Sequence, residues 1–534
     1  MRIKWKWMRA SLGALLCAVA VAAPTGAVDA STKKHPKPVN VQLLALNDFH
    51  GQLNVSKTVN GKPAGRADYL ASHLKQREAE NKNTLMVHAG DMVGASAPVS
   101  ALMQDEPTIE VLNKLDFDVG TVGNHEFDEG VKEMMRLIYG GRHEKTGYFK
   151  GADFPYTAAN VVSAKTKSPI LPPHVIKRVK GVPIGFIGVV TKETPSIVTP
   201  DGVKGVKFTD ETKAINREVK KLKKKGVRAI VVLAHEGGFQ DQQTNQMEGP
   251  IVRIAKDVND EVDVIVAGHS HSYLNGTVDG KLVVQSYSSG AAFSDIDLTL
   301  DRRTRDIVKK KAEVVTTFQE GWKPDPAVAE IVSRYEKKVA PIINEEVGTA
   351  AKTLTREPTP AGESPLGNLV ADAQRWKMKT DFAFMNPGGI RSDLEAGKVT
   401  WGDLYTMQPF NNDLVTMKLT GEQLKRLLNQ QWQADRTRLL QISGLSYTWD
   451  PSRPLGDRVT ELKKTDGTPI TDGETYSVTA NSFIASGGDA FTVFKEGTDK
   501  VVGPVDLDAL VEYIKQLPQP FSADIEGRIK KAGN

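Results

Sequence analysis

The sequence predicts a mixed α/β protein with two α/β domains joined by a helix. The chain has 534 residues, and one hydrophobic core rarely grows beyond about 250–300 residues, so at least two domains are expected. Short apolar runs alternate with helix-like stretches through the first half. These runs are rich in Val, Ile and Leu without strict alternation, which is typical of strands buried on both faces.

The first thirty residues predict a secretory signal peptide at 1–30. Basic residues at Arg2 and Lys4 precede an apolar stretch at 10–23, and small residues suited to cleavage follow. A retained membrane anchor is the weaker alternative, because a span needs roughly 20 apolar residues. The only cysteine, Cys17, lies in this stretch, so the mature chain has no disulfide and no thiolate metal site. We expect a secreted protein, extracellular or periplasmic, without stable membrane association.

The charge balance excludes little by itself. The formal net charge of +5 comes from 70 basic and 65 acidic residues, too small an excess to indicate nucleic acid as a partner. A dense lysine run at 220–225 is interrupted by Leu222 and follows Val219. This spacing favours the solvated face of a helix over a polyanion site. The sequence does not indicate an oligomeric state.

The first domain is predicted at 39–320. Its clearest strands are expected at six apolar runs: 41–46, 84–88, 184–190, 229–233, 262–267 and 282–285. A connecting helix is predicted within 325–347, because Asp325 and Pro326 suit the N-cap and the first helical position. One face of this helix is marked by Val328, Val332, Tyr335, Val339 and Ile343. Pro341 is expected to bend or end it.

The second domain is predicted at 348–530, with elements of its own. Helices are expected at 369–377 and 422–432. Strands are expected at 414–418, 445–449 and 475–480.

Five segments of the first domain share one arrangement, in which Asp, Asn or His stands at or just beyond the end of an apolar stretch. The segments are 47–50, 90–91, 123–128, 234–235 and 268–271. Each alone is more often a turn or a helix cap. If the stretches are parallel strands, however, their carboxyl ends bring all five segments to one edge, where α/β proteins bind ligands.

The side chains of these segments predict a metal centre. The candidate ligands are Asp48, His50, Asp91, Asn124, His235, His269 and His271. Mixed nitrogen and oxygen ligands suit Zn, Mn, Co or Fe better than Ca. Seven side chains exceed the needs of one ion, and Asp91 is a candidate to bridge two ions about 3.5–4 Å apart.

Three segments of the second domain, 386–391, 409–412 and 481–489, combine Gly or Asn with an aromatic or an arginine. Each alone is most simply a tight turn with a core Phe. As a binding site, Phe410 and Phe483 would sandwich a flat base. Asp489 would accept hydrogen bonds from ribose hydroxyls, and Arg391 would bind phosphate.

The ordered metal motifs resemble those of calcineurin-like metallophosphoesterases. The longer forms at 46–51 and 123–128 resemble the 5'-nucleotidase branch, and the resemblance covers nearly the whole chain from Val39. It implies a four-layer α/β-β/α metallophosphoesterase domain, followed by a 5'-nucleotidase substrate-binding domain. It also implies two divalent metal ions as cofactors, with Zn, Mn or Co left open.

The resemblance implies a role for each site residue. The first ion would be held by Asp48, His50, Asp91 and His271, and the second by Asp91, Asn124, His235 and His269. His125 would face the scissile phosphate as the catalytic acid or imidazolium, oriented by Asp128; a helix cap is the alternative reading of Asp128. Substrate would be bound by Asn386, Arg391, Phe410, Asn412, Gly444, Phe483 and Asp489. Some relatives place a substrate arginine near 364–368, whereas this chain has none between Arg356 and Arg375.

The expected function is that of a secreted, metal-dependent 5'-nucleotidase, a phosphoric monoester hydrolase that converts a nucleotide to nucleoside and phosphate. Two enzyme alternatives share the metals and the fold. One is a 2',3'-cyclic-nucleotide 2'-phosphodiesterase with 3'-nucleotidase activity, and the other a UDP-sugar hydrolase. A nucleoside-binding or adhesive protein without catalysis is a third, against which the complete ligand set argues.

Overall fold

The structure is a computed structural model that describes residues 37–434 and 436–533. The predicted signal peptide and Cys17 lie outside the described residues. Within these two ranges no helix combines the length and the apolar character that crossing a bilayer requires.

The first half of the chain contains two six-stranded sheets. The first has the order β20-β19-β1-β4-β5-β8, in which β1, β4, β5 and β8 run parallel and β19 and β20 are antiparallel additions. Its strands are β1 (Val39–Leu46), β4 (Thr84–His88), β5 (Val119–Thr121), β8 (Tyr156–Thr157), β19 (Ala292–Leu300) and β20 (Ile307–Thr316).

The second sheet has the order β10-β11-β13-β16-β18-β17, with β11, β13, β16 and β18 parallel. Its strands are β10 (Val175–Val179), β11 (Val182–Val190), β13 (Ala229–His235), β16 (Val264–Ala267), β17 (Tyr273–Val278) and β18 (Lys281–Ser286). Two antiparallel strands, β10 and β17, form its edges.

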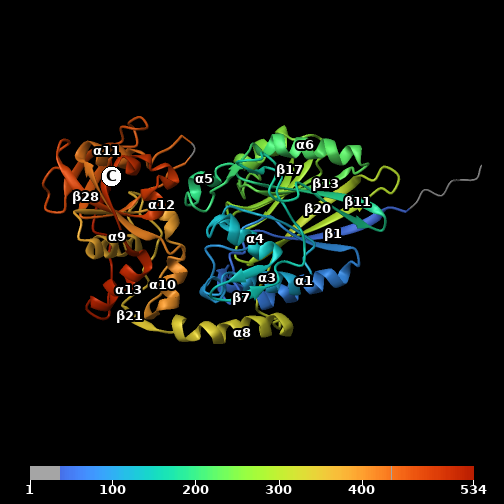
Figure 1. The fold of residues 1–534 in the computed structure, drawn as a ribbon, viewed down its shortest axis with the longest axis horizontal. Coiled ribbons are helices and arrows are strands. Elements are labelled where there is room, and N and C mark those ends of the chain that lie inside the picture. Colours follow the sequence, from blue (N-terminus) through green and yellow to red (C-terminus); the bar gives the residue numbers. More distant parts are fainter. Residues whose placement is uncertain (1–36, 435, 534) are drawn as a thin grey trace, which may run out of the picture. The chain divides into compact units, whose positions relative to one another are not determined.

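The two sheets pack face to face, because the central strands of each sheet present apolar side chains to the other sheet. Val41 and Leu43 of the first sheet share one buried cluster with Val231 and Leu233 of the second. Helices cover both outer faces (Figure 1). The helices are α1 (Ala67–Glu80) and α3 (Glu106–Lys114) on the first sheet, and α6 (Glu211–Lys224) and α7 (Pro250–Asp257) on the second. Helix α8 (Pro326–Ile343) packs against α1 and α3. The predicted four-layer α/β-β/α arrangement is confirmed.

Helix α6 carries the lysine run noted in the sequence. The Asp210 carboxylate caps the helix by accepting a hydrogen bond from the amide of Lys213. Val219 and Leu222 are fully buried against the second sheet, while Lys220 is exposed. The lysine run therefore lies on the exposed face of a helix, as its spacing predicts.

Helix α8 begins as the sequence predicts. Pro326 is its first residue, and the Asp325 carboxylate accepts a hydrogen bond from the amide of Val328 at 3.0 Å. Pro341 does not stop the helix at once, since it lies in the last turn and α8 ends at Ile343. A proline there removes one amide donor only two residues before the helix ends.

The second half contains a five-stranded sheet of order β25-β22-β28-β24-β29 and a three-stranded sheet of order β27-β26-β30. Their strands are β22 (Phe382–Met385), β24 (Asp413–Thr420), β25 (Gln441–Ser443), β26 (Leu445–Trp449), β27 (Val459–Lys464), β28 (Thr475–Asn481), β29 (Thr498–Val505) and β30 (Ile529–Lys531). The main helices are α9 (Pro365–Met378), α10 (Trp401–Met407), α11 (Gly421–Asn429), α12 (Ser482–Ala485) and α13 (Asp506–Gln516).

Most predicted elements occur, with bounds that differ by a few residues. The helix expected at 422–432 ends earlier, at Asn429. The reason is local: Trp432 forms an isolated antiparallel bridge with Thr437, which needs extended backbone.

We predict that Asp325→Ala lowers the stability of the first half by about 1 kcal/mol, the usual contribution of an N-cap side chain. Asp325 also pairs with Lys75 Nζ at 2.7 Å. Asp325→Asn is the matched control, because asparagine caps equally well but carries no charge. Calorimetric melting of both variants separates the two contributions. Equal losses in Ala and Asn variants would assign the effect to the ion pair.

Candidate active site

The five motif segments meet at one end of the two-sheet stack. The ends of β1, β4 and β5 in the first sheet lead into Asp48, Asp91 and Asn124. In the second sheet β13 ends on His235, and β16 leads into His269. The expected single edge is thus the common carboxyl end of two packed sheets, which explains how residues more than 200 positions apart become neighbours.

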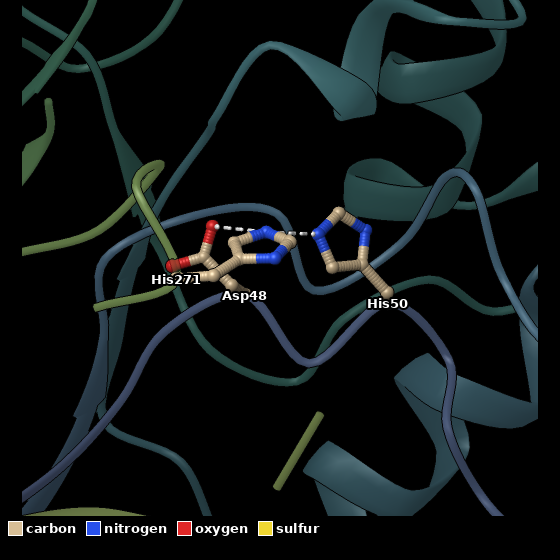
Figure 2. Close-up of side chains that lie close together, drawn as sticks. All are labelled: Asp48, His50 and His271. Atoms are coloured by element: carbon tan, nitrogen blue, oxygen red, sulfur yellow. Dashed lines mark hydrogen bonds and ion pairs between the residues drawn. The ribbon is translucent and has the colours of Figure 1, made fainter. Parts of the chain in front are cut away.

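One cluster of candidate ligands contains Asp48, His50 and His271, whose ligand atoms lie within 4.8 Å of one another. The His271 ring lies between the other two side chains (Figure 2). Its Nε2 is 3.1 Å from Nε2 of His50 and 3.4 Å from Oδ1 of Asp48.

A second cluster contains Asp91, His235 and His269 within the same limit. Nε2 of His235 is 3.0 Å from Oδ2 of Asp91 and 3.1 Å from Oδ1 of Asn124. The same Asp91 oxygen lies 3.8 Å from Nε2 of His50, in the first cluster. Asp91 therefore stands between the two clusters.

The histidine geometry fits bound cations. Nδ1 of His50 donates to the carbonyl of Gly94 at 2.8 Å, and Nδ1 of His235 donates to the carbonyl of Ala89 at 2.9 Å. In each neutral ring the Nε2 lone pair then faces the cluster. Metal-ligating histidines commonly have this arrangement, in which a backbone carbonyl fixes the tautomer. The nitrogen and oxygen donors suit a transition metal or zinc.

The backbone is strained where these side chains converge. Five of the seven candidate ligands have a positive φ, between 50° and 71°. They are Asp48, His50, Asp91, His269 and His271. A left-handed non-glycine residue costs roughly 1–2 kcal/mol, and such strain gathers at functional sites. Position 123 requires a glycine for a steric reason, because a Cβ there would lie 2.2 Å from Oδ1 of Asp91.

The protonation states also suit metal binding. Burial alone would raise the pKa of Asp91, but His235 and His125 outweigh it and hold this pKa well below its usual range. Burial and the charge of His235 lower the pKa of His269 to about 3, so its ring is neutral. Burial lowers the pKa of His235, but the Asp91 carboxylate outweighs burial and raises this pKa to about 10. A cation bound between them would take the place of that proton.

Glu126 ties two of the motif loops together. Its carboxylate accepts hydrogen bonds from the amides of Asp91 at 3.0 Å and Met92 at 2.8 Å, and also from the amide of Gly123. Burial, followed by the charge of Asp91, raises the pKa of Glu126 to about 7. Glu126 lies within segment 123–128 but is not among the predicted site residues.

His125 lies beside both clusters without being needed to complete either. Its Nδ1 is 2.7 Å from Oδ2 of Asp128, which leaves Nε2 for another partner. Burial lowers the pKa of His125, but Asp128 and Asp91 outweigh burial and raise it. The carboxylate of Asp128 thus accepts a hydrogen bond from the His125 ring. His125 also belongs to a third group of potential ligands with His50 and Asp91.

A cavity of about 600 Å³ adjoins the clusters. The first half of the chain contributes Asn124, His125, Asp128 and His269 to its lining. The second half contributes six of the seven predicted substrate residues: Asn386, Arg391, Phe410, Asn412, Phe483 and Asp489. The Phe410 ring stacks on His125 with a centroid distance of 5.8 Å and lies 5.8 Å from Cζ of Arg391.

The structure does not bring Gly444 to this cavity. Gly444 joins β25 to β26 with φ 86°, and a Cβ there would lie 2.0 Å from the carbonyl oxygen of Asp381. Close backbone contact and a left-handed conformation account for this glycine.

Two further residues, Arg438 and Asn481, contact predicted substrate residues without being predicted as site residues themselves. Arg438 lines the cavity, with Nε 3.1 Å from Oδ1 of Asp489. Asn481 donates to Oδ1 of Asn386 at 2.9 Å, and Asn386 in turn donates to Asp489 at 3.3 Å. Arg438 stands in a stretch without a motif, so no pattern in the sequence could have identified it.

Comparisons with known proteins agree with this architecture. Residues 41–273 match the calcineurin-like phosphoesterase family, and residues 346–496 match the 5'-nucleotidase C-terminal domain. A crystal structure of a 5'-nucleotidase precursor from Thermus thermophilus superposes with a TM-score of 0.79 at 30% identity. That match covers 93% of this chain and all of the other.

Two curated relatives are similar along most of this chain. Endonuclease YhcR of Bacillus subtilis is 45% identical over 92% of this chain, which spans 41% of that protein. Cell wall protein Lmo0130 of Listeria monocytogenes is 37% identical over 92% of this chain, which spans 69% of that protein.

The chain belongs to the 5'-nucleotidase family of calcineurin-like phosphoesterases. It is a phosphoester hydrolase of a class that uses divalent metal ions.

We predict that Asp91→Ala loses nearly all hydrolysis and binds less metal, because its carboxylate lies between the two clusters. Metal content by elemental analysis and phosphate release are the two measurements. Full activity with an unchanged metal content would exclude Asp91 as a bridging ligand.

We predict that His125→Ala keeps its metal content while kcat falls by roughly 10²–10⁴-fold, the usual contribution of a general acid. His143→Ala is a matched control, because His143 lies outside the motif segments and the cavity lining. Loss of one ion from the His125 variant would instead make His125 a ligand, as its place in the third group allows.

Proposed function

We propose that this chain is an exported 5'-nucleotidase that hydrolyses nucleoside phosphates to nucleoside and phosphate. One observation carries the proposal: a single cavity is lined both by ligands of the candidate metal clusters and by two phenylalanines with an Asn–Asp network. We assign catalysis to a domain at 39–320, a connecting helix to 325–347 and substrate binding to 348–530.

We assign one ion to Asp48, His50, Asp91 and His271, and the other to Asp91, Asn124, His235 and His269. Bound ions of this kind polarise a phosphoryl oxygen and lower the pKa of water. The remaining catalytic role falls to a side chain of the protein. His125 Nε2, on a ring held by Asp128, faces the cavity as the donor that stabilises charge on the phosphate or leaving oxygen.

The second half of the chain would select the substrate. Phe410, Phe483 and Asp489 line the cavity; we assign the two rings to the faces of a base and the carboxylate to ribose hydroxyls. Arg438 and Asn386 hold the Asp489 carboxylate from two sides. Binding energy from the nucleoside would thus be supplied away from the reacting phosphate.

Names of relatives support the location and define the alternatives. One relative is called a cell wall protein, which supports export. Others are called an endonuclease, a trifunctional nucleotide phosphoesterase and snake venom 5'-nucleotidases. A phosphodiester substrate is therefore the second candidate. We propose the monoester because the cavity is lined by groups suited to a single nucleoside, namely Phe410, Phe483 and Asp489.

A substrate panel tests this choice. Phosphate release is measured with Zn, Mn or Co on AMP, ATP, UDP-glucose, 3'-AMP, 2',3'-cyclic AMP and a short oligonucleotide. AMP should be hydrolysed with the highest kcat/KM, and chelation should abolish the activity. Faster cleavage of the cyclic nucleotide or of the oligonucleotide would replace the proposed 5'-nucleotidase with a phosphodiesterase.

We predict that Phe483→Ala lowers kcat/KM for AMP by roughly tenfold to a hundredfold, since stacking contributes about 1–3 kcal/mol per base. Activity on p-nitrophenyl phosphate should stay nearly constant, because that substrate has no base. Phe239→Ala, at an exposed phenylalanine outside the cavity lining, is the control. Equal losses on both substrates would give Phe483 a packing role.

A further inference from the structure

Exposed basic residues gather where three turns of the first half meet. These turns follow β10, α6 and β19, and two contacts join them. Nη1 of Arg302 donates to the carbonyl of Lys180 at 2.8 Å, and the amide of Ala229 donates to the carbonyl of Arg305 at 3.1 Å. We call this surface the basic corner, formed by Lys180, Lys224, Lys225, Arg302, Arg303 and Arg305, all exposed.

Carboxylates near the basic corner are engaged by other groups. Asp301 Oδ1 accepts hydrogen bonds from the amides of Arg303 at 2.8 Å and Thr304 at 2.7 Å, as in an Asx turn. Glu261 and Asp306 both lie against Arg228, at 2.7 Å and 3.6 Å. The six basic side chains of the corner still outnumber these three carboxylates, so the corner carries an excess of positive charge, although the whole chain has a net charge of only +5.

The basic corner lies at the opposite end of the sheets from the candidate active site. Strand β13 starts at Ala229, beside Arg228, and ends on His235. Seven residues at about 3.3 Å per residue separate the two by roughly 20 Å. Strand β11 starts just after Lys180 and runs parallel to β13. The corner therefore cannot reach the phosphate that reacts.

The side chains of the corner offer no stacking surface for unpaired bases and little apolar surface for a lipid layer. Among the described residues at 174–182, 223–229 and 300–309 there is no Phe, Tyr or Trp. Single-stranded nucleic acids gain much of their affinity from stacking on such rings. Insertion into a lipid surface also uses large apolar or aromatic groups, and Val308 is the single large exposed hydrophobic residue in these three segments.

We propose that the basic corner binds a linear polyol phosphate polymer of the cell envelope, holding the enzyme on an anionic surface with its catalytic end directed away. The choice of an envelope polymer rests on the proposed export of the chain. The binding contact itself is independent of the substrate preference. Each phosphate of such a polymer accepts a charge-assisted hydrogen bond from Lys or Arg, and the affinity falls as salt rises.

The test uses the full chain and a matched pair of triple variants. Lys224→Gln, Arg303→Gln and Arg305→Gln together neutralise three corner side chains. Lys132→Gln, Lys337→Gln and Lys425→Gln remove the same charge from exposed positions elsewhere. Binding is measured on immobilised poly(glycerol phosphate), on poly(A) and on phosphatidylglycerol vesicles, at two salt concentrations, with AMP hydrolysis as the check of folding.

The corner variant should bind poly(glycerol phosphate) roughly tenfold to a hundredfold more weakly than the control variant, with equal AMP hydrolysis in both. Unchanged binding by the corner variant would overturn the proposal. Tighter binding to poly(A) or to vesicles than to poly(glycerol phosphate) would overturn the choice of partner. If AMP is not a substrate for any form, only the proposed function fails, because polymer binding is read separately.

Discussion

The hydrogen bond from His235 to the carbonyl of Ala89 is the contact on which the site depends. His235 ends a strand of one sheet, and Ala89 follows a strand of the other. The bond fixes the imidazole tautomer and joins the two sheets at this end. Asp91 and Asn124, on the first sheet, reach His235 only because the apolar layer between the sheets holds them in register.

Folding and metal affinity are linked through this geometry. The candidate ligands come from two sheets, so a cation held by Asp91 and His235 would act as a cross-link between them. Ligands that bind only the folded state raise its stability by mass action. The strained backbone at Asp48, His50 and Asp91 works against the fold, and coordination would offset that cost. Metal removal should therefore loosen this end of the stack first.

Local patterns carried most of the fold, whereas long-range geometry decided the rest. Strand 84–88 and the start of α8 follow from apolar runs and from Asp325–Pro326. The distribution of the strands over two sheets depends on pairing between distant residues, which a single sequence does not encode visibly. Arg438 reaches Asp489 through a tertiary contact, and Gly444 serves the backbone at a turn; neither role has a local pattern.

The two cavity phenylalanines, Phe410 and Phe483, differ in their surroundings, because only Phe410 stacks on His125. Phe410 touches the residue assigned to proton donation, so an altered ring there changes turnover and base preference together. Phe483 instead packs over Gly488, where an added Cβ would lie 2.5 Å from its ring. Selection for a new base could act through the slot formed by Phe483 and Gly488 without disturbing catalysis. Substitutions at Phe410 would be constrained by its contact with His125.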